Sequence, residues 1–438
     1  MKRILLGLAI LYSSYSLAPL QKAFSCGCNN TDPEFESSYQ LSYTFRAVEP
    51  KPFDYFGSAL VIEDGVVAIK RDSGYFDGDG FSSTVIFEQQ GKHFWRPVEK
   101  FDFDAGGTEG NPFFGQELAI DGGEIVVGYS HTYTDARSRP LQFIAKEQNG
   151  WERTTSGIDF RTFPERARGG NRLAGRSVDI SGDWAIAEET NAIRTDGSVG
   201  VARVYHRSEA GQWLEIANLF PESGRDISIT TVAIDGTTAA LVDRTINDGG
   251  LYFFERQSDG QWVETQSFPQ NLANSRGYFS RVVEIDGDTA VTRDEGSGIV
   301  SIYEREAGVW DLVHEVDSST PQFVITGGVA LEGDLVAYTE GTSEAGRDPY
   351  RVKLLRRQQD GTWDYEGTIS HPDPFSRQIF GADLDFDQGR LLISGGAARD
   401  WRSYVPPGAA YLYTPIPEPA SLMLLFLAGL ASTARSRN

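Results

Sequence analysis

The 438-residue chain is poor in cysteine, in methionine and in positive charge. Its two cysteines, Cys26 and Cys28, are too few for a disulfide framework or a zinc cluster. Two methionines beside 47 glycines favour turn-rich β structure over a helical fold. The formal net charge of −22 argues against nucleic acid or an anionic lipid surface as the main partner. The apolar content of 40% still suffices for a packed core, so the chain is not expected to be disordered.

The N-terminus has the pattern of a secretory signal peptide. Lys2 and Arg3 precede an apolar stretch from Ile4 to Leu11, and small and polar residues follow it. This pattern predicts export, with removal of residues 1–25 and a flexible leader over residues 26–38.

The cleavage site and the fate of the cysteines stay open. Cleavage after Ser25 leaves Cys26 first, and Ala18 is an earlier alternative site. We interpret Cys26 and Cys28 as a local Cys-x-Cys pair in the leader, and lipid modification of Cys26 is the alternative.

Self-similarity is the strongest signal in the chain. A turn made of an apolar residue, a polar and usually acidic residue and a nearby glycine recurs seven times, with 46 to 60 residues between successive glycines. Short β-type runs flank each turn, and glycine tolerates the positive φ that such hairpin turns need. The glycines of the seven turns are Gly65, Gly122, Gly182, Gly236, Gly287, Gly333 and Gly389.

A second Gly-rich hairpin follows in most units, and a tryptophan comes directly after its turn. Its fixed place in the repeat predicts packing between neighbouring units, whereas a stacking platform for a ligand is the alternative. Four short strands in a unit of about 50 residues are the signature of a propeller blade. We therefore predict an all-β, seven-bladed β-propeller over residues 39–414. The tryptophans are Trp95, Trp151, Trp213, Trp262, Trp310 and Trp363.

The two ends of this region predict how the ring closes. The seventh unit supplies three strands and stops before a fourth. The segment from Tyr39 to Pro50 aligns with the fourth strand of the other units. An N-terminal strand is therefore expected to complete the last blade, which removes an exposed sheet edge.

Phe-Gly pairs open three of the units, and they carry a family resemblance. Phe56-Gly57, Phe114-Gly115 and Phe380-Gly381 begin units one, two and seven. Together with the turn that follows, these units resemble FG-GAP repeats, the blades of integrin-α-type propellers. Ala174-Gly175 and Phe279-Ser280 are degenerate versions, and units four and six lack the pair.

The resemblance raises the question of calcium, because some blades of that family carry a calcium loop. Asp72, Asp77 and Asp79 offer carboxylates in the segment DSGYFDGDGF. Their spacing does not fit that loop or an EF-hand. We expect no cofactor and interpret this segment as a solvated turn, and calcium bound at these aspartates is the alternative.

Catalytic motifs are missing from the sequence. The five histidines are scattered over different strands, and no Gly-x-Ser-x-Gly, Walker or HExxH motif is present. We therefore expect no enzyme. The sequence leaves open whether two acids form a catalytic pair for glycoside hydrolysis, because only their geometry identifies such a pair.

The long connections between strands two and three are the expected ligand-binding region. Neighbouring Arg and Asp recur where the second strand ends, which we interpret as ion pairs between blades or as hydrogen-bonding groups for a polar polymer. Aromatic side chains beside them supply stacking surfaces. The candidate ligand-binding residues are Tyr129, Tyr133, Arg137, Arg293, Asp294, Arg399, Asp400, Trp401 and Tyr404.

The C-terminal segment 415–438 is expected to be a sorting signal. Its apolar part, Ala420 to Thr433, makes about 21 Å of helix, short of a hydrocarbon core of about 30 Å. The order of a Pro-Glu-Pro, a short apolar helix and two arginines resembles the PEP-CTERM signal, with Ile416 where Val is usual. The residues of this motif are Pro417, Glu418, Pro419, Arg435 and Arg437.

That resemblance implies export in a Gram-negative-type bacterium, transient inner-membrane retention and processing by an exosortase-type enzyme. It also implies a place at the cell surface or in a biofilm matrix. The sequence therefore predicts a non-catalytic surface or matrix protein that binds exopolysaccharide or protein through its propeller loops. A glycoside hydrolase or polysaccharide lyase, and a structural protein without a specific ligand, are the alternatives.

Overall fold

The computed structural model describes residues 37–50, 55–72, 82–103, 113–130, 141–154, 173–193, 199–222, 229–243, 249–269, 282–294, 298–316, 327–340, 350–373, 379–396 and 407–416. Every regular element in these ranges is a β-strand, and the strands form seven antiparallel sheets of four strands each. The described part of the chain contains no helix of the length and apolar character that crossing a membrane requires.

Blades 1 to 6 each take four consecutive strands, with the first strand at one edge and the fourth at the other. Blade 1 holds β2 (Leu60–Glu63), β3 (Val66–Asp72), β4 (Ser82–Gly91) and β5 (Phe94–Phe103). Blade 2 holds β6 (Phe113–Asp121), β7 (Glu124–Ser130), β8 (Leu141–Glu147) and β9 (Gly150–Arg153). Blade 3 holds β10 (Leu173–Ser181), β11 (Trp184–Ile193), β12 (Val199–Arg207) and β13 (Trp213–Leu219).

The later blades follow the same order. Blade 4 holds β14 (Ile229–Asp235), β15 (Thr238–Asp243), β16 (Gly250–Arg256) and β17 (Trp262–Pro269). Blade 5 holds β18 (Val282–Asp286), β19 (Thr289–Arg293), β20 (Val300–Glu306) and β21 (Val309–Val316). Blade 6 holds β22 (Val329–Glu332), β23 (Leu335–Glu340), β24 (Arg351–Arg357) and β25 (Trp363–Ser370).

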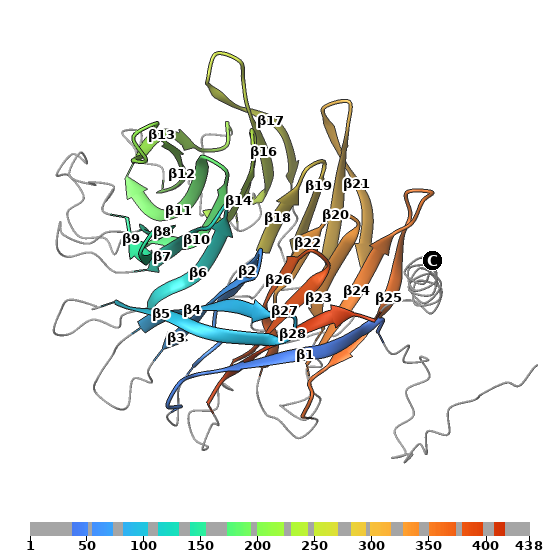
Figure 1. The fold of residues 1–438 in the computed structure, drawn as a ribbon. Helices are drawn as coiled ribbons and strands as arrows, with labels where there is room; N and C mark the ends of the chain where they lie inside the picture. Colours follow the sequence, from blue (N-terminus) through green and yellow to red (C-terminus); the bar gives the residue numbers. More distant parts are fainter. Residues whose placement is uncertain are drawn as a thin grey trace, which may run out of the picture. The chain divides into compact units, whose positions relative to one another are not determined.

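Blade 7 combines the two ends of the described chain. It holds β26 (Ile379–Asp387), β27 (Arg390–Gly396), β28 (Ala409–Pro415) and, as its fourth strand, β1 (Tyr39–Arg46). The register of β1 on β28 runs from Tyr39 opposite Pro415 to Arg46 opposite Ala409. The prediction of a seven-bladed propeller closed by an N-terminal strand is confirmed (Figure 1).

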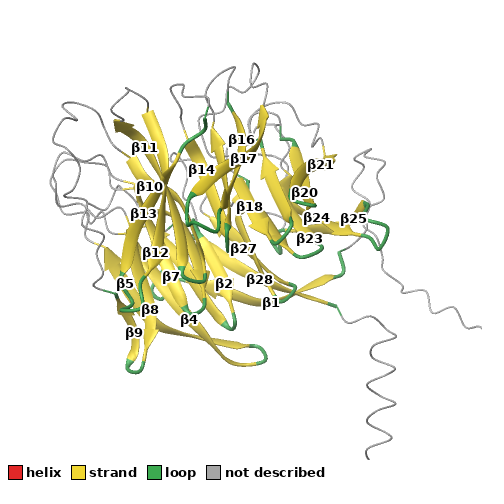
Figure 2. Cartoon of the chain, turned by 90° about the horizontal axis from the view of Figure 1, so that it is seen from above, coloured by secondary structure: helices red, strands yellow, loops and turns green. Residues whose placement is uncertain are grey.

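The first strands of the blades lie innermost. Each of β2, β6, β10, β14, β18, β22 and β26 contacts the first strand of the next blade, and β26 contacts β2, so these contacts form a closed circle. We call the space that they enclose the axis. The fourth strands lie at the outer edges of the sheets, as Figures 1 and 2 show for β17, β21 and β25.

The hydrophobic core is divided among the seven interfaces between blades. Each interface holds its own cluster of buried apolar side chains from the two blades that face each other. Between blades 4 and 5, for example, Ala233 and Phe253 pack with Val283 and Trp310. The alternation of side chains along each strand therefore buries both faces of a blade, one against each neighbour.

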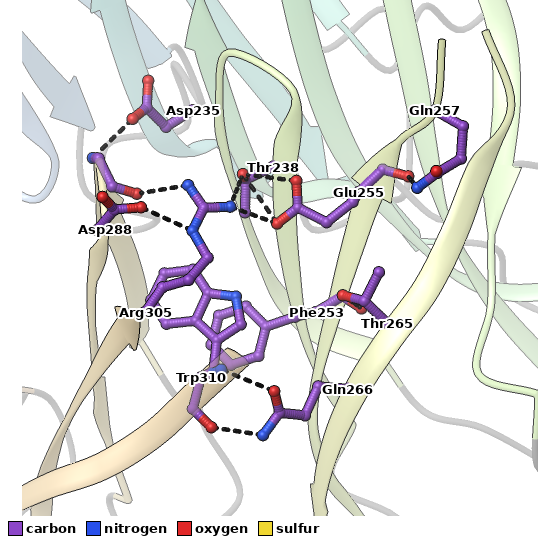
Figure 3. A network of polar contacts seen from close by, with 11 residues as sticks. Asp235, Thr238, Phe253, Glu255, Gln257, Thr265, Gln266, Asp288, Arg305 and Trp310 are labelled. Atoms are coloured by element: carbon purple, nitrogen blue, oxygen red, sulfur yellow. Dashed lines mark hydrogen bonds and ion pairs between the residues drawn. The ribbon is translucent and has the colours of Figure 1, made fainter. Parts of the chain in front are cut away.

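Tryptophans at the start of the fourth strands join neighbouring blades, as the repeat predicts. Trp310 of blade 5 stacks on Phe253 of blade 4 with the ring centroids 4.2 Å apart (Figure 3). The guanidinium of Arg305 lies over the Trp310 ring and donates to Thr238 of blade 4 at 2.9 Å. Gln266 of blade 4 accepts from the Trp310 backbone N–H at 2.8 Å. Both the ring face and the backbone of this tryptophan therefore make contacts between blades.

Other interfaces add a hydrogen bond from the indole to an acid of the preceding blade. The indole N–H groups of Trp151, Trp213 and Trp363 donate at 2.9 Å to Glu88, Glu124 and Glu304, respectively. A cation from the same blade as the tryptophan pairs with each acid, as Arg207 does with Glu124 at 2.8 Å. The prediction that these tryptophans pack between blades is confirmed.

Each repeated turn also bonds to the preceding blade. At six of the seven interfaces, a polar side chain at the end of one first strand accepts a backbone N–H of the next blade's turn. In these turn bonds Gly122 and Gly123 donate to Glu63, Gly182 to Asp121, Gly236 to Ser181, Gly287 to Asp235, Gly333 to Asp286, and Gln388 and Gly389 to Glu332. At the seventh interface the Gln388 amide donates to Asp64 at 2.6 Å. The circuit of turn bonds therefore closes around the ring.

The Phe-Gly pairs have a packing role in the described blades. Gly381 has a φ of +82°, and a Cβ there would lie 2.5 Å from Thr339 Oγ1 of blade 6. The Gly381 carbonyl accepts the Gly328 N–H at 2.8 Å. Gly57, with a φ of +87°, approaches the carbonyl of Ala409 in the same way. Glycine is required here by both the backbone conformation and the close approach of the preceding blade.

We expect Glu332→Ala to lower the free energy of unfolding by about 1–2 kcal/mol, because two turn N–H groups lose a charged acceptor. Glu332→Gln keeps an acceptor oxygen and should lose less. Urea unfolding of both variants checks this, with Glu209→Ala at an exposed turn as the control. Equal stability of Glu332→Ala and the control would contradict a role for the turn bonds.

Gly381→Ala should lower the free energy of unfolding by about 3 kcal/mol, since positive φ and a clash with Thr339 add up. The matched control is Gly361→Ala, where φ is +85° but the nearest atom, on Arg357, lies 3.8 Å away. There only the conformational penalty of about 1–2 kcal/mol applies. Similar losses for the two variants would show that the close approach does not matter.

Candidate functional site

Most residues proposed for ligand binding and sorting lie outside the described residues. These are Tyr133, Arg137, Arg399, Asp400, Trp401, Tyr404, Asp77, Asp79, Pro417, Glu418, Pro419, Arg435 and Arg437. Tyr129 belongs to β7, and Asp72 is the last residue of β3.

Arg293 and Asp294 are part of the fold at the end of β19. Arg293 is only 1% exposed, and its guanidinium lies against Gly327, where a Cβ would be 1.4 Å from Nη1. The backbone of Asp294 bonds to Ile299 and Gly298, which closes the connection to β20. The burial of Arg293 favours the structural interpretation of this Arg-Asp pair.

The sequence reasoning missed a group of acids around the axis. Alternate positions of the first strands point toward the next blade. Apart from the last residue of each strand, five of them carry carboxylates, from blades 2, 3, 5 and 7. All five are surrounded by protein and keep partial solvent access. We call Glu117, Asp179, Glu284, Asp383 and Asp385 the axial acids.

Four of the axial acids accept backbone N–H groups of the next blade. Asp383 and Asp385 of blade 7 accept from Leu60 and Ile62 of blade 1 at 2.8 and 2.6 Å. The other two acids repeat this contact in blades 2 and 3: Glu117 accepts from Val178 at 2.9 Å and Asp179 from Ile234 at 2.7 Å.

The reason for these bonds is the free edge of each first strand. The first strand pairs with the second strand on one side only. The N–H groups on its other side, which face the axis, therefore have no partner within the blade. Carboxylates from the preceding blade satisfy them with charge-assisted hydrogen bonds. Ser177 does the same with a hydroxyl, accepting from Val232 N–H at 3.0 Å.

Burial raises the pKa of every axial acid, and repulsion from other acids adds to this effect at all of them except Asp383. Burial is the largest cause throughout, and it raises the pKa of Glu117 to about 8 and those of Asp179 and Asp383 to about 7. The pKa values of Glu284 and Asp385 are also raised well above their ordinary range. The bonds from backbone N–H groups act in the opposite direction at four of the acids, but they do not outweigh burial.

Glu284 differs from the other axial acids. None of the described residues donates a hydrogen bond to its carboxylate, and repulsion from all four other axial acids adds to the effect of burial. On the neighbouring strand β14, Thr231 is 2% exposed and its hydroxyl has no hydrogen-bond partner among the described residues. Both groups therefore differ from their counterparts in blade 3, which accept a backbone N–H.

The arrangement limits which chemistry the axial acids can support. No three His, Cys, Asp or Glu side chains of the described residues come close enough to hold one metal ion directly. Four of the carboxylates are already engaged by backbone N–H groups, so their primary role is to join blades. The lining is acidic, and it favours protons or cations over anions.

A sequence signal for the axial acids exists. Acidic residues occur inside otherwise apolar runs that precede the repeated turn, as in Val178-Asp179-Ile180 and Val283-Glu284-Ile285. A strand that is buried on both faces does not usually carry charge at such positions. This pattern identifies unusual positions, although it does not show that they meet at one axis.

Comparisons with known proteins identify no family for this chain. No model of a known protein family matches it, and no curated protein sequence matches it. Solved structures align with low scores: a periplasmic gluconolactonase of Pseudomonas aeruginosa has a TM-score of 0.45 at 13% identity, over 73% of this chain and 86% of that chain.

Two further structures align similarly. A candidate 6-phosphogluconolactonase of Bacteroides uniformis has a TM-score of 0.46 at 13% identity, over 72% of this chain and 85% of that chain. The endosialidase of phage phi92 has a TM-score of 0.44 at 9% identity, over 86% of this chain and 70% of that chain. These values carry no inference about activity or ligand.

The raised pKa values predict a stability that falls as the pH rises. The folded state favours the protonated form of the axial acids. Their contribution to the free energy of unfolding is therefore complete below about pH 4, the pKa of carboxyl groups in the unfolded chain. It is lost as the pH rises through about 7 and 8. In buffer with a chelator, calorimetry should therefore give a Tm several degrees lower at pH 8.5 than at pH 5.

The variant Asp383→Asn separates this effect from the net charge of the chain. The amide oxygen still accepts from Leu60 N–H but does not titrate, so the Tm should depend less steeply on pH. Asp259→Asn at an exposed turn is the matched control and should keep the wild-type slope. A Tm that is constant or rises from pH 5 to pH 8.5 would contradict the prediction.

Proposed function

We propose that this protein is exported and acts as a non-catalytic binding protein at the cell surface or in the extracellular matrix. Its ligand is a polysaccharide or a protein, bound by the connections between strands two and three and between blades. An exosortase-type enzyme sorts the chain through its Pro-Glu-Pro tail.

The observation that carries this proposal is the position of the two ends of the described chain. Ile416 donates its backbone N–H to the Ser38 carbonyl at 2.6 Å, and Pro415 lies 3.7 Å from the position of a Cβ on Gly389. Gly389 belongs to the repeated turn between β26 and β27. Both ends therefore meet at the face that carries the tight turns, next to the start of the sorting segment.

The opposite face is the one available to a ligand in this proposal. In an antiparallel blade, the connection from strand two to strand three and the connection to the next blade lie at the strand ends away from the tight turns. If the tail leads to the membrane, these connections point away from it. Their sequences are long and varied, which suits specific binding.

Removal of residues 417–438 tests the sorting part of the proposal. The truncated protein should appear in the culture medium, whereas the full chain should fractionate with the cell envelope. The double variant Arg435→Ala, Arg437→Ala should give an intermediate or full release without altering the propeller. Unchanged cell association of the truncated protein would contradict the sorting role.

A panel of polysaccharides tests the binding part, with and without calcium. We expect retention on at least one acidic or neutral matrix polysaccharide, and no shortening of the polymer during incubation. Shortening of the polymer would identify the alternative, a hydrolase or lyase. An absence of retention on every polysaccharide would rule out the polysaccharide ligand.

A further inference from the structure

At three interfaces between blades, one carboxylate accepts from two donors of the following blade. The donors are a cation near the end of the third strand and the indole N–H of the tryptophan that begins the fourth strand. The nitrogen–oxygen distances lie between 2.7 and 3.0 Å. The repeat therefore builds a position for one carboxylate, which we call the acid position. The three sets are Glu88 with Lys146 and Trp151, Glu124 with Arg207 and Trp213, and Glu304 with Arg357 and Trp363.

The interface between blades 3 and 4 keeps both donors but has no carboxylate in the acid position. Arg256 and Trp262 of blade 4 hold the cation and tryptophan positions, opposite each other on β16 and β17. His206 of blade 3 lies opposite the first residue of the second strand, as the acids on the third strands of blades 1 and 5 do. Val204 and Phe254, two residues earlier on each strand, pack between these blades, so His206 and Arg256 also face this interface.

Arg256 also lacks the second acid that other arginines of the repeat use. Arg207 and Arg305 pair at 2.7 Å with an aspartate in the tight turn of their own blade, and Figure 3 shows this contact for Arg305. The backbone N–H of each of these arginines donates to the carbonyl of that aspartate, whereas Arg256 donates to Thr237 at 2.8 Å. Thr237 therefore stands in place of the aspartate. No hydrogen bond or ion pair joins the Arg256 guanidinium to another residue that the structure describes.

Two buried donors at this interface have no acceptor. The Nε atom of Arg256 and the indole nitrogen of Trp262 are closed to solvent and have no hydrogen-bond partner among the described residues. Buried donors are normally satisfied, so such a pair points to a missing acceptor. The indole nitrogen of Trp310 in blade 5 also has no partner, but its arginine, Arg305, is held by two acids.

Aromatic rings hold Arg256 where the acids are missing. Its guanidinium carbon lies 4.7 Å from the centroid of the Trp184 ring, which also contacts the rings of His206 and Trp262 at 4.3 and 5.9 Å. A guanidinium that stacks on a ring uses its face, while its N–H groups point outward in its own plane. Stacking therefore fixes Arg256 without occupying the donors that a carboxylate needs. All four side chains are half-buried, so the cluster has a solvent-accessible side.

We propose that the interface between blades 3 and 4 binds the carboxylate of a small organic ligand, which fills the empty acid position. The Arg256 guanidinium and the Trp262 indole N–H both donate to it. Entry requires the His206 ring to turn away from Trp184, because Nε of Arg256 and the Trp262 indole nitrogen are otherwise closed to solvent. The carboxylate belongs to a free organic acid or to the uronic-acid group of a saccharide, which share this chemistry.

This inference does not rest on the proposed function. The third strand ends and the fourth strand begins at the face that carries the tight turns, opposite the connections assigned to the polysaccharide or protein ligand. Loss of binding at one face therefore leaves the other face available to be measured separately.

Nuclear magnetic resonance of the full chain with isotope-labelled tryptophan tests the site, because eight tryptophans give eight indole N–H signals. Sodium acetate, glucuronate and a glucuronate oligomer should each move the Trp262 signal, which Trp262→Phe identifies, until it saturates. Sodium chloride and glucose should leave it in place. Tighter binding of the oligomer than of acetate would identify a saccharide as the source of the carboxylate, and equal binding a free acid. No movement with any of the three carboxylates would overturn the proposal.

Variants connect the response to the empty acid position. His206→Glu supplies an internal carboxylate, so it should abolish ligand binding and raise the Tm by roughly 2 °C relative to His206→Gln. Arg256→Gln should weaken binding by about tenfold or more, since the charged donor is lost. Arg96→Gln on an exposed part of β5 removes the same charge and should keep full binding. Full binding in His206→Glu or Arg256→Gln would overturn the proposal, as would a Tm of His206→Glu below that of His206→Gln.

Discussion

The structure depends on one recurring interaction, in which a side chain of one blade accepts a backbone N–H of the next. A propeller must join sheets that share no strand, and its innermost strands have one edge without a sheet partner. Carboxylates and hydroxyls close that gap at the axis, as Asp383 does with Leu60, and at the turns, as Glu332 does with Gly389. The same interaction therefore sets the spacing of the blades and closes the ring.

These contacts concentrate negative charge around the axis, where the acids are largely surrounded by protein. Each carboxylate is favourable toward its N–H donor, but together the axial acids repel one another and resist ionisation. The bonds that Asp179 and Asp385 accept lower their pKa values but do not outweigh burial. Glu284 receives no such bond from the described residues, so nothing there offsets the effect of its burial on its pKa.

The tight turns and the other connections lie on opposite faces of the ring because the strands alternate in direction. The tight turns, the start of β1 and the end of β28 share one face, where Ile416 donates its backbone N–H to the Ser38 carbonyl. The turn bonds and the tryptophan contacts keep the blades in register independently of the connections on the other face. Those connections are therefore free to vary in length and composition without loss of the fold.

The sequence by itself determined the number of blades, the hairpins within each blade and the closing strand, because these features are local or periodic. The glycine at position 236 predicts a turn with positive φ, and the alternation of apolar and polar residues predicts each strand. The fixed place of Trp213 in the repeat predicts its contact with the preceding blade. The sequence did not identify the axial acids as a group. Glu117 and Asp383 meet only after the ring closes, across 266 residues of sequence, and no local pattern states which sheet edge faces the axis. Only the tertiary structure decided that these carboxylates share one enclosed space, because ring closure brings together strand edges that the sequence keeps far apart.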